Sequence, residues 1–198
     1  GGNNSTEYKH ILDSMVHLEF ESGLRSTGFC VGQRDIFVYA HGVGEGSMMF
    51  EHRSVAYEIP EDMYEVEQFV TGQGKMDMAR IVIDSSIGLE FKGMWKHIAK
   101  PIFSRDALLI TKMDNLFRER EAGTVKDAGM IVMKDFDGNI QGMRMNEISY
   151  YALTVRGDCG SLLLQKQYGT WKIIAMHNGS RQGLAYGVRL DVCIAKYE

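Results

Sequence analysis

Cysteine is scarce in this chain of 198 residues, and long apolar runs and excess positive charge are missing. The three cysteines, at positions 30, 159 and 193, are an odd number and too widely spread for a disulfide framework, which favours a reducing compartment. No apolar run approaches the length of a membrane span. The formal net charge of −4 argues against binding nucleic acid through overall charge, so such a role would need a local patch.

Close Cys-x-x-Cys and His-x-x-x-His pairs are also missing. A metal site made of Cys159, His177 and a further His or Cys is therefore a poor alternative, and we expect neither a metal nor an organic cofactor. What is present is typical of a globular protein, with 44% hydrophobic and 24% charged residues. The length suits one substantial domain or two packed subdomains of about a hundred residues each.

One helical pattern precedes many short β-rich runs. Ser5 or Thr6 is suited to cap a helix from Glu7 to about His17, after a flexible leader over residues 1–4. From Gly23 onward, short apolar runs alternate with Gly, Asp and Asn. Many short strands at this spacing indicate a sandwich or barrels.

The second half contains two expected β-hairpins, with turns at Asp137-Gly138 and Tyr168-Gly169. The mixed segment around Pro101 is interpreted as the connection between two β subdomains, with a boundary between residues 95 and 108. The charged run 118–121, Arg-Glu-Arg-Glu, is interpreted as a solvated loop.

Cys159 lies in the stretch TVRGDCGSLLL, residues 154–164, with glycines on both sides. A buried structural cysteine needs no such glycines, whereas a nucleophile on a tight turn does. Gly157 and Gly160 allow a sharp turn that exposes the thiol, and the N–H groups of Gly157 and Cys159 could together donate to a developing oxyanion. The alternative is a buried cysteine at the start of a strand.

A thiolate nucleophile needs a base, and His41 is the best placed of the six histidines. It ends the apolar run IFVYA and precedes Gly42-Val43-Gly44, where a strand opens into a loop. Asp77, just before an alternating β run, is our choice for the carboxylate that orients the imidazole. Three other acids stay open as alternatives to it: Glu45, Glu67 and Asp84.

The stretches GFCVGQRDIFVYAHG, DMARIVI, TVRGDCGSLL and IIAMHNGS follow one another in the order His, acid, Cys, His. In this order they resemble the picornavirus-type 3C-like cysteine proteases over nearly the whole chain. The most specific piece is Gly-x-Cys-Gly at residues 157–160, supported by a histidine at 177. Ser161 and Ala175 stand where many members have glycine, which suggests a distant relative.

The resemblance implies an all-β, chymotrypsin-like double β-barrel, with two antiparallel six-stranded barrels and a short N-terminal helix. The expected domains are a leader and helix over residues 1–20, a barrel carrying the histidine and acid over 21–100, and a barrel carrying the nucleophile and specificity pocket over 101–198. The implied activity is that of a viral cysteine endopeptidase that processes the viral polyprotein in the cytoplasm of the host cell.

The same resemblance implies the roles of individual residues. Cys159 would be the nucleophile, His41 the general base and acid, and Asp77 the orienting carboxylate. The N–H groups of Gly157 and Cys159 would form the oxyanion hole.

Cleavage after Gln, with Glu tolerated, is the specificity that the resemblance implies. His177 and Thr154 would line the pocket, and both could donate to the side-chain carbonyl of glutamine. Tyr150 would bind the other ring nitrogen of His177 and keep it uncharged. The alternative for His177 is an ordinary core histidine with satisfied hydrogen bonds.

Host proteins are further expected substrates, and RNA is a second expected partner. Lys92, Lys96 and Lys100 surround Trp95 and could contact phosphates beside an aromatic ring, although the family's usual basic motif is missing and a solvated linker is the alternative. An inactive chymotrypsin-fold module that binds RNA is the alternative function, and it predicts a missing member of the triad.

Overall fold

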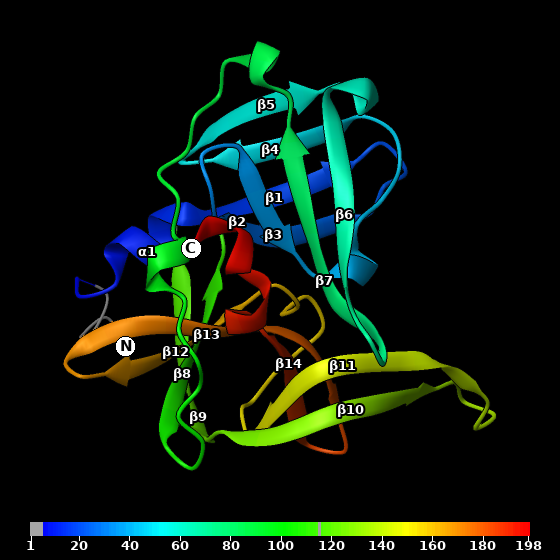
Figure 1. Ribbon diagram of the computed structural model, residues 1–198, viewed down its shortest axis with the longest axis vertical. Helices are drawn as coiled ribbons and strands as arrows, with labels where there is room; N and C mark the ends of the chain where they lie inside the picture. The colour runs from blue at the N-terminus through cyan, green and yellow to red at the C-terminus, as the bar shows by residue number, and fades with distance from the viewer. Residues whose placement is uncertain (1–5, 115) are drawn as a thin grey trace.

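The computed structural model of the chain describes residues 6–114 and 116–198, and it consists of two antiparallel β-sheets with seven strands each (Figure 1). The all-β architecture expected from the sequence is confirmed, with one strand more in each sheet than expected. No helix in this described part is both long and apolar enough to cross a membrane.

The first sheet is built from the N-terminal half of the chain. Its strands are β1 (Met15–Phe20), β2 (Arg25–Cys30), β3 (Asp35–Val38), β4 (Met48–His52), β5 (Val55–Ile59), β6 (Tyr64–Thr71) and β7 (Gly74–Ile83). They lie in the order β5-β4-β1-β2-β3-β7-β6. Strand β3 is buried along its whole length, and its neighbour β7 is buried from Met76 to Ile81. The pair β3–β7 is therefore a rigid support for whatever follows β3.

The second sheet is built from the C-terminal half. Its strands are β8 (Asp106–Lys112), β9 (Phe117–Thr124), β10 (Lys126–Lys134), β11 (Ile140–Tyr150), β12 (Leu162–Gln167), β13 (Thr170–Arg181) and β14 (Leu184–Arg189). They lie in the order β10-β11-β14-β13-β12-β8-β9. Strands β10 and β11 form a long ribbon that extends beyond the rest of the sheet (Figure 1).

The two expected hairpins are present at the expected turns. Gln167 pairs with Thr170, and Tyr168 and Gly169 between them both have positive φ, as a two-residue turn requires. At the tip of the ribbon, the Asp135 carboxylate accepts the N–H groups of Asp137 and Asn139. Side-chain capping of this kind is why Asp favours turns.

The N-terminal helix is shorter than expected. Helix α1 spans only Lys9–Ser14 and begins after Tyr8, which makes no side-chain capping bond, so the proposed cap at Thr6 is wrong. The proposed cap at Ser5 and the leader 1–4 lie outside the described residues. Residues 15–17 belong to strand β1, because pairing with β2 and β4 on both sides outweighs the helical spacing. The first sheet thus takes in residues that the expected division gave to the leader and helix.

The charged run at 118–121 is not a solvated loop. It forms half of strand β9 (Phe117–Thr124), which pairs with β8 at the edge of the second sheet. Side chains alternate between the two faces of a strand, so the two arginines share one face and the two glutamates the other. The inward arginines have a buried partner, described below.

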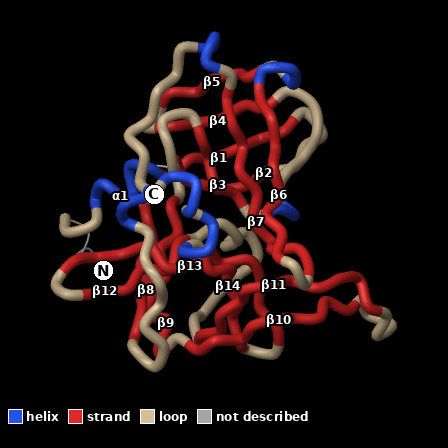
Figure 2. The backbone as a smooth tube through the Cα atoms, in the orientation of Figure 1, coloured by secondary structure: helices blue, strands red, loops and turns tan. Residues whose placement is uncertain are grey.

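One hydrophobic core joins the two sheets. Its buried members from the second sheet include Ile110, Leu162 and Leu164, which pack into the same cluster as the side chains of the first sheet. The connection over residues 84–105 runs along one side of both halves (Figure 2) and contains the short 3-10 turns η3 (Ser85–Ile87) and η4 (Trp95–His97).

The last residues of the chain fold back over the first sheet. They form two short 3-10 turns, η5 (Asp191–Cys193) and η6 (Ala195–Tyr197). The ring of Tyr197 stacks on Trp95, with 6.2 Å between ring centroids, and the Tyr197 hydroxyl donates to Asp35. Residues from the far end of the chain therefore help to hold the first sheet.

Candidate active site

His41 and Asp77 are brought together by neighbouring strands. The chain leaves β3 through the 3-10 turn η1 (Ala40–Gly42), and the register of Val38 opposite Ala79 puts this turn beside Asp77. His41 Nδ1 lies 2.8 Å from Asp77 Oδ2, and the His41 backbone N–H donates to Asp77 Oδ1 at 3.0 Å. The buried carboxylate therefore fixes both the backbone and the ring of His41.

Cys159 reaches the same histidine from the other sheet. It is a free, half-buried cysteine in the loop between β11 and β12, and its side chain lies close enough to that of His41 to raise the pKa of the imidazole. The structure thus joins Asp77, His41 and Cys159 in one chain of side-chain contacts across the boundary between the sheets.

The electrostatics of this group favour a charged imidazole. Burial opposes the charge on His41, but the hydrogen bonds to Asp77 and Cys159 outweigh it and raise the pKa of His41 to about 9. Burial also opposes ionisation of Asp77, yet the hydrogen bond from His41 and the nearby Arg144 guanidinium lower the pKa of that carboxyl. The pair is therefore an ion pair at neutral pH.

Two glycines shape the loop around Cys159. Gly157 and Gly160 have φ of +97° and +93°, in the left-handed region that side chains disfavour. A Cβ at Gly160 would also collide with the backbone carbonyl of Thr27 in the first sheet. Within the described residues, the backbone N–H groups of Gly157 and Cys159 donate to no protein acceptor, whereas Asp158, Gly160 and Ser161 are all donors. Two N–H groups next to the thiol are thus free to bind an anion.

His177 and Tyr150 lie together in the second sheet, close behind this loop. Gly160 N–H donates to the His177 carbonyl, and His177 N–H donates to that of Ser161. The ring Nδ1 of His177 is 2.7 Å from the Tyr150 hydroxyl, a shorter contact than the 3.2 Å from that hydroxyl to the carbonyl of Tyr186. Burial lowers the pKa of His177 to about 4, so its imidazole is neutral at physiological pH.

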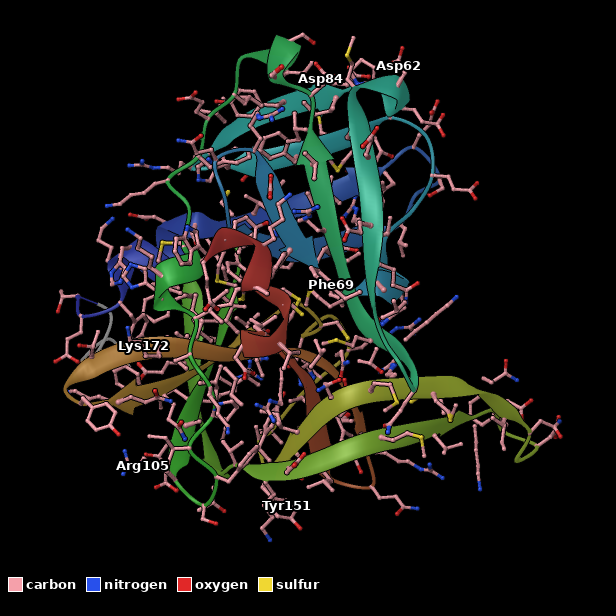
Figure 3. All side chains as sticks on the ribbon, viewed as in Figure 1. Asp62, Phe69, Asp84, Arg105, Tyr151 and Lys172 are labelled. Carbon is pink, nitrogen blue, oxygen red and sulfur yellow. The ribbon has the colours of Figure 1, made fainter. Side chains whose placement is uncertain are left out.

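Thr154 is half-buried in the segment before the loop and, among the described residues, shares no hydrogen bond with His177 or Tyr150. The three other candidate acids have different partners. Asp84 caps η3 by accepting the Ser86 N–H at 2.8 Å, and Figure 3 shows it at the end of the first sheet that faces away from the second. Glu67 pairs with Arg80 at 2.6 Å, and the backbone of Glu45 donates to Ser22.

Arg144 and Glu147 also adjoin the group, and neither was expected there from the sequence pattern. Arg144 Nε lies 3.5 Å from Asp77 Oδ2, and its Nη1 donates to the Asn178 carbonyl at 3.0 Å. Glu147 is fully buried and accepts a hydrogen bond from Asn178 Nδ2 at 2.9 Å. Burial outweighs that bond and raises the pKa of Glu147 to about 7.

A β-bulge brings these two side chains to one face. Glu147 pairs with Gly129 and Arg144 with Ile131, so two residues of β11 face one residue of β10 between these pairs. Asn146, within the bulge, has φ of +59°. Residues three apart would otherwise lie on opposite faces of a strand, which is why the alternation of the sequence could not reveal the pair.

Two cavities border the group. One of about 490 Å³ is lined by Cys159, Gly157, Thr27 and Tyr39, among others. The other, of about 460 Å³, lies between the β10–β11 ribbon and the strand residues after His177, and Arg144 and Glu147 line it. Among the described residues, no group of three His, Cys, Asp or Glu side chains is arranged to hold a metal ion.

Comparisons with known proteins agree with this geometry. The sequence model of the family described as 3C cysteine protease (picornain 3C) matches residues 2–181. No curated protein matches the chain significantly.

Several solved structures share the fold. The HRV-C 3C protein with rupintrivir is 16% identical with a TM-score of 0.69, and the match covers 93% of each chain. A catalytically inactive tobacco etch virus protease with substrate is 15% identical with a TM-score of 0.66, covering 96% of this chain and 85% of that one. The tobacco vein mottling virus protease is 14% identical with a TM-score of 0.67, covering 96% and 84%. At such identities the likeness establishes the fold, the chymotrypsin-like double β-barrel expected from the sequence.

Proposed function

The chain belongs to the 3C cysteine protease (picornain 3C) family, and from that premise we propose that it cleaves its polyprotein after glutamine with a triad of Cys159, His41 and Asp77. Family membership makes it a viral cysteine protease; the residue roles and the specificity are the proposal. One observation carries it: Asp77 holds the ring and the backbone of His41 by two hydrogen bonds, and the Cys159 side chain lies beside the same imidazole.

The proposed reaction is acyl transfer in two steps. The thiolate of Cys159 attacks the scissile carbonyl carbon, whose oxygen becomes an oxyanion held by the N–H groups of Gly157 and Cys159. The C–N bond breaks as the His41 imidazolium gives its proton to the leaving amine, and a thioester remains. Neutral His41 then takes a proton from water, the resulting hydroxide attacks the thioester, and the acid product leaves with the thiolate restored.

Asp77 acts on this reaction through His41. Its two oxygens hold the ring and the backbone N–H of His41, so the free ring nitrogen is aimed at Cys159 throughout both proton transfers. The ion pair also stabilises the imidazolium that exists before the amine leaves. Loss of Asp77 should therefore slow turnover less than loss of His41 or Cys159.

Selection of glutamine is proposed to rest on His177. The short contact between the Tyr150 hydroxyl and His177 Nδ1 supports donation from the hydroxyl to this nitrogen. The imidazole proton is then on Nε2, where it is available to donate to the carbonyl of a glutamine side chain. The neutral state of the buried imidazole supports binding of an uncharged amide over a carboxylate. Thr154 is proposed as a second donor from the segment before the loop.

The test of the triad is turnover of a glutamine-containing peptide by purified variants. Cys159→Ala and His41→Ala should each lower kcat by several orders of magnitude without changing the circular dichroism spectrum, because the triad acts as a unit. Asp77→Ala should be milder. A peptide Michael acceptor should form an adduct on Cys159 alone, since burial raises the pKa of Cys30 to about 12 and also raises that of Cys193. An adduct only on Cys30 or Cys193, or full turnover by Cys159→Ala, would exclude the triad.

The specificity is tested with a peptide library varied only at the residue before the cleaved bond. We expect Gln first and Glu at a lower rate, and His177→Ala should lower kcat/KM for Gln peptides strongly because the amide is left unpaired in a desolvated pocket. A preference for basic or large apolar residues would exclude this pocket. Host proteins with matching sites and action in the cytoplasm of the host cell remain part of the proposal.

RNA binding is proposed as a second activity, supported by one cluster of positive side chains. Lys92 lies close enough to His10 and His97 to lower the pKa of both, after the larger effect of burial, and Lys172 acts on His97 as well. The ring of Trp95 is stacked on Tyr197, so that face of the ring is not free to stack on a base. Binding of fluorescent single-stranded RNA should weaken with salt and with Lys92→Gln plus Lys172→Gln; unaltered binding by this double variant would exclude the cluster.

A further inference from the structure

We propose that Arg118 and Arg120 of β9, together with Asp158, form a clamp that holds the nucleophile loop in its active conformation. Asp158 is then a positioning residue that acts through the backbone of Cys159. This inference rests on the proposed role of Cys159 as nucleophile.

The clamp is a dense set of charge-assisted contacts. Arg118 Nη2 donates to both carboxylate oxygens of Asp158, at 2.8 and 2.9 Å. Arg120 Nη1 donates to Asp158 Oδ2 at 2.8 Å. Asp158 lies 40 and 38 positions after the two arginines, so these contacts tie the loop to β9 at the edge of the second sheet.

Burial makes the carboxylate depend on its two partners. The side chain of Asp158 is only 4% exposed, and that of Arg120 only 12%, whereas Arg118 is 40% exposed. A carboxylate removed from water is stable only when paired and hydrogen-bonded, and taking away one partner leaves a buried charge unbalanced. The arginines therefore determine whether Asp158 can stay inside.

The same contacts hold the chain on both sides of the loop. Before the loop, Asp158 Oδ2 accepts the Val155 N–H at 2.8 Å, and Arg120 Nη1 donates to the Leu153 carbonyl at 2.7 Å. After the loop, Thr111 Oγ1 lies 2.6 Å from Ser161 Oγ and also bonds Arg120. The segment that contains Thr154 and the turn that contains Cys159 are thus anchored to one point.

The anchoring determines where the Cys159 N–H points. The Asp158 carbonyl accepts the Ser161 N–H at 3.0 Å, and the Asp158 N–H donates to the Val155 carbonyl at 3.1 Å. A peptide unit is planar and trans, so fixing the Asp158 carbonyl makes the Cys159 N–H point in the opposite direction. With its side chain held by β9, Asp158 cannot rotate and this peptide plane stays fixed.

Variants of the clamp should lower kcat. Asp158→Asn keeps the shape of the side chain but loses its charge, and Arg118→Gln or Arg120→Gln leaves the carboxylate short of a partner. Loss of one oxyanion donor typically costs a factor of 10² to 10³, so misalignment of the Cys159 N–H should lower kcat by about ten- to a hundredfold. Arg120→Lys, which keeps the charge, should retain more activity than Arg120→Gln.

Two probes separate positioning from a merely structural role. A peptide aldehyde forms a hemithioacetal whose oxygen needs the oxyanion donors, so its affinity should fall in parallel with kcat. Iodoacetamide alkylates the thiolate without forming an oxyanion, so the alkylation rate of Cys159 should stay within about twofold of wild type. A clamp that only stabilises the fold would change neither probe in the folded protein.

Arg189→Gln is the matched control, because Arg189 forms a similarly buried ion pair with Asp191 at 2.8 Å in the same sheet. It should lower Tm without lowering kcat. If Asp158→Asn does not fold, Arg118→Gln provides the test, since Arg118 is the most exposed member. Unchanged kcat in the folded clamp variants, or equal loss of alkylation and turnover, would overturn the clamp. If wild type itself neither turns over peptide nor is alkylated at Cys159, the proposed function fails instead.

Discussion

Glu147 is a carboxyl group without exposed surface on β11, the strand that leads into the nucleophile loop, and it lies next to the His41–Asp77 pair. Its carboxylate has one oxygen bonded to Asn178, and the other has no hydrogen-bond partner within the described part of the chain. Burial is the main reason that its pKa rises to about 7. Between pH 4.5 and 7, the unfolded chain therefore loses the Glu147 proton while the folded chain keeps it, which lowers stability as the pH rises.

We expect Glu147→Gln to stabilise the protein at pH 8 but not at pH 4.5. At pH 8 both states of the wild type are ionised, and the difference between a pKa of about 7 and the ordinary value amounts to about 3 kcal/mol at most. Urea unfolding of the wild type and of Glu147→Gln at the two pH values measures this difference in the free energy of unfolding. The control is Glu121→Gln, which changes an exposed residue on β9 in the same way. An equal effect of Glu147→Gln at both pH values would contradict the raised pKa.

At the level of residues, the sequence identified candidate site residues where their chemistry requires particular neighbours in the chain. A cysteine between two glycines and a histidine at the end of a strand can be recognised from neighbours in the chain, and His41, Asp77 and Cys159 do lie together. Arg144 and Asp158 could not be recognised in the same way. Their partners are far away in sequence, and Arg144 reaches its place only through the bulge at Asn146.

Among the elements, the β10–β11 ribbon has the most exposed apolar tip. Phe136 is fully exposed there, yet it lines the cavity of about 460 Å³ together with Gly179, Ser180 and Arg181. An aromatic side chain that packs against nothing in the free protein contributes little to stability. Its place at the rim of the cavity gives it a role only when a ligand is bound.

Phe136→Ala should leave Tm unchanged and raise KM several-fold for peptides long enough to fill this cavity. Short peptides that reach only His177 should be unaffected. The control is Tyr168→Asn, an equally exposed aromatic residue at the tip of the other hairpin, where Asn tolerates the positive φ. An unchanged KM for long peptides would show that the ribbon does not contact substrate.

Strands were predicted well where turn residues mark their ends. They were predicted poorly where only pairing with neighbouring strands makes a segment a strand. Both hairpin turns carry glycine after a polar or aromatic residue, and both were located correctly. The alternating charges of β9 suggested exposure, because a sequence does not reveal that one face of a strand will meet a buried carboxylate. Similarly, β1 continued a helical pattern, and only its pairing on both sides makes it a strand.

At the scale of the whole molecule, the larger hydrophobic core reaches across both sheets, so we expect the protein to unfold in a single transition. The two tryptophans report on different parts: Trp171 lies in the second sheet, and Trp95 lies in the connection and packs on Tyr197. Fluorescence of Trp95→Phe and of Trp171→Phe should give the same urea midpoint, after correction for the stability of each variant by circular dichroism. Two separate midpoints would mean that the halves unfold independently.

The division into two halves was predictable from the hairpins and the mixed connection. The packing of the two sheets against each other was not predictable. Apolar runs predict that strands are buried without indicating against which partner. Ile110, Leu162 and Leu164 belong to the second sheet by hydrogen bonding and to the common core by packing. The close approach of Gly160 to Thr27 at the boundary is another contact that only the assembled protein has.

The dependence of the nucleophile loop on later strands has a consequence for biosynthesis. A nascent chain that has just emerged past Cys159 already contains His41, Asp77 and both arginines of the clamp. It still lacks His177, whose backbone carbonyl and N–H bind Gly160 and Ser161, and the strand β14 that pairs with β13. Such a chain carries every reacting group without an arranged site, so proteolysis should begin only after the ribosome has added the strands that follow the nucleophile.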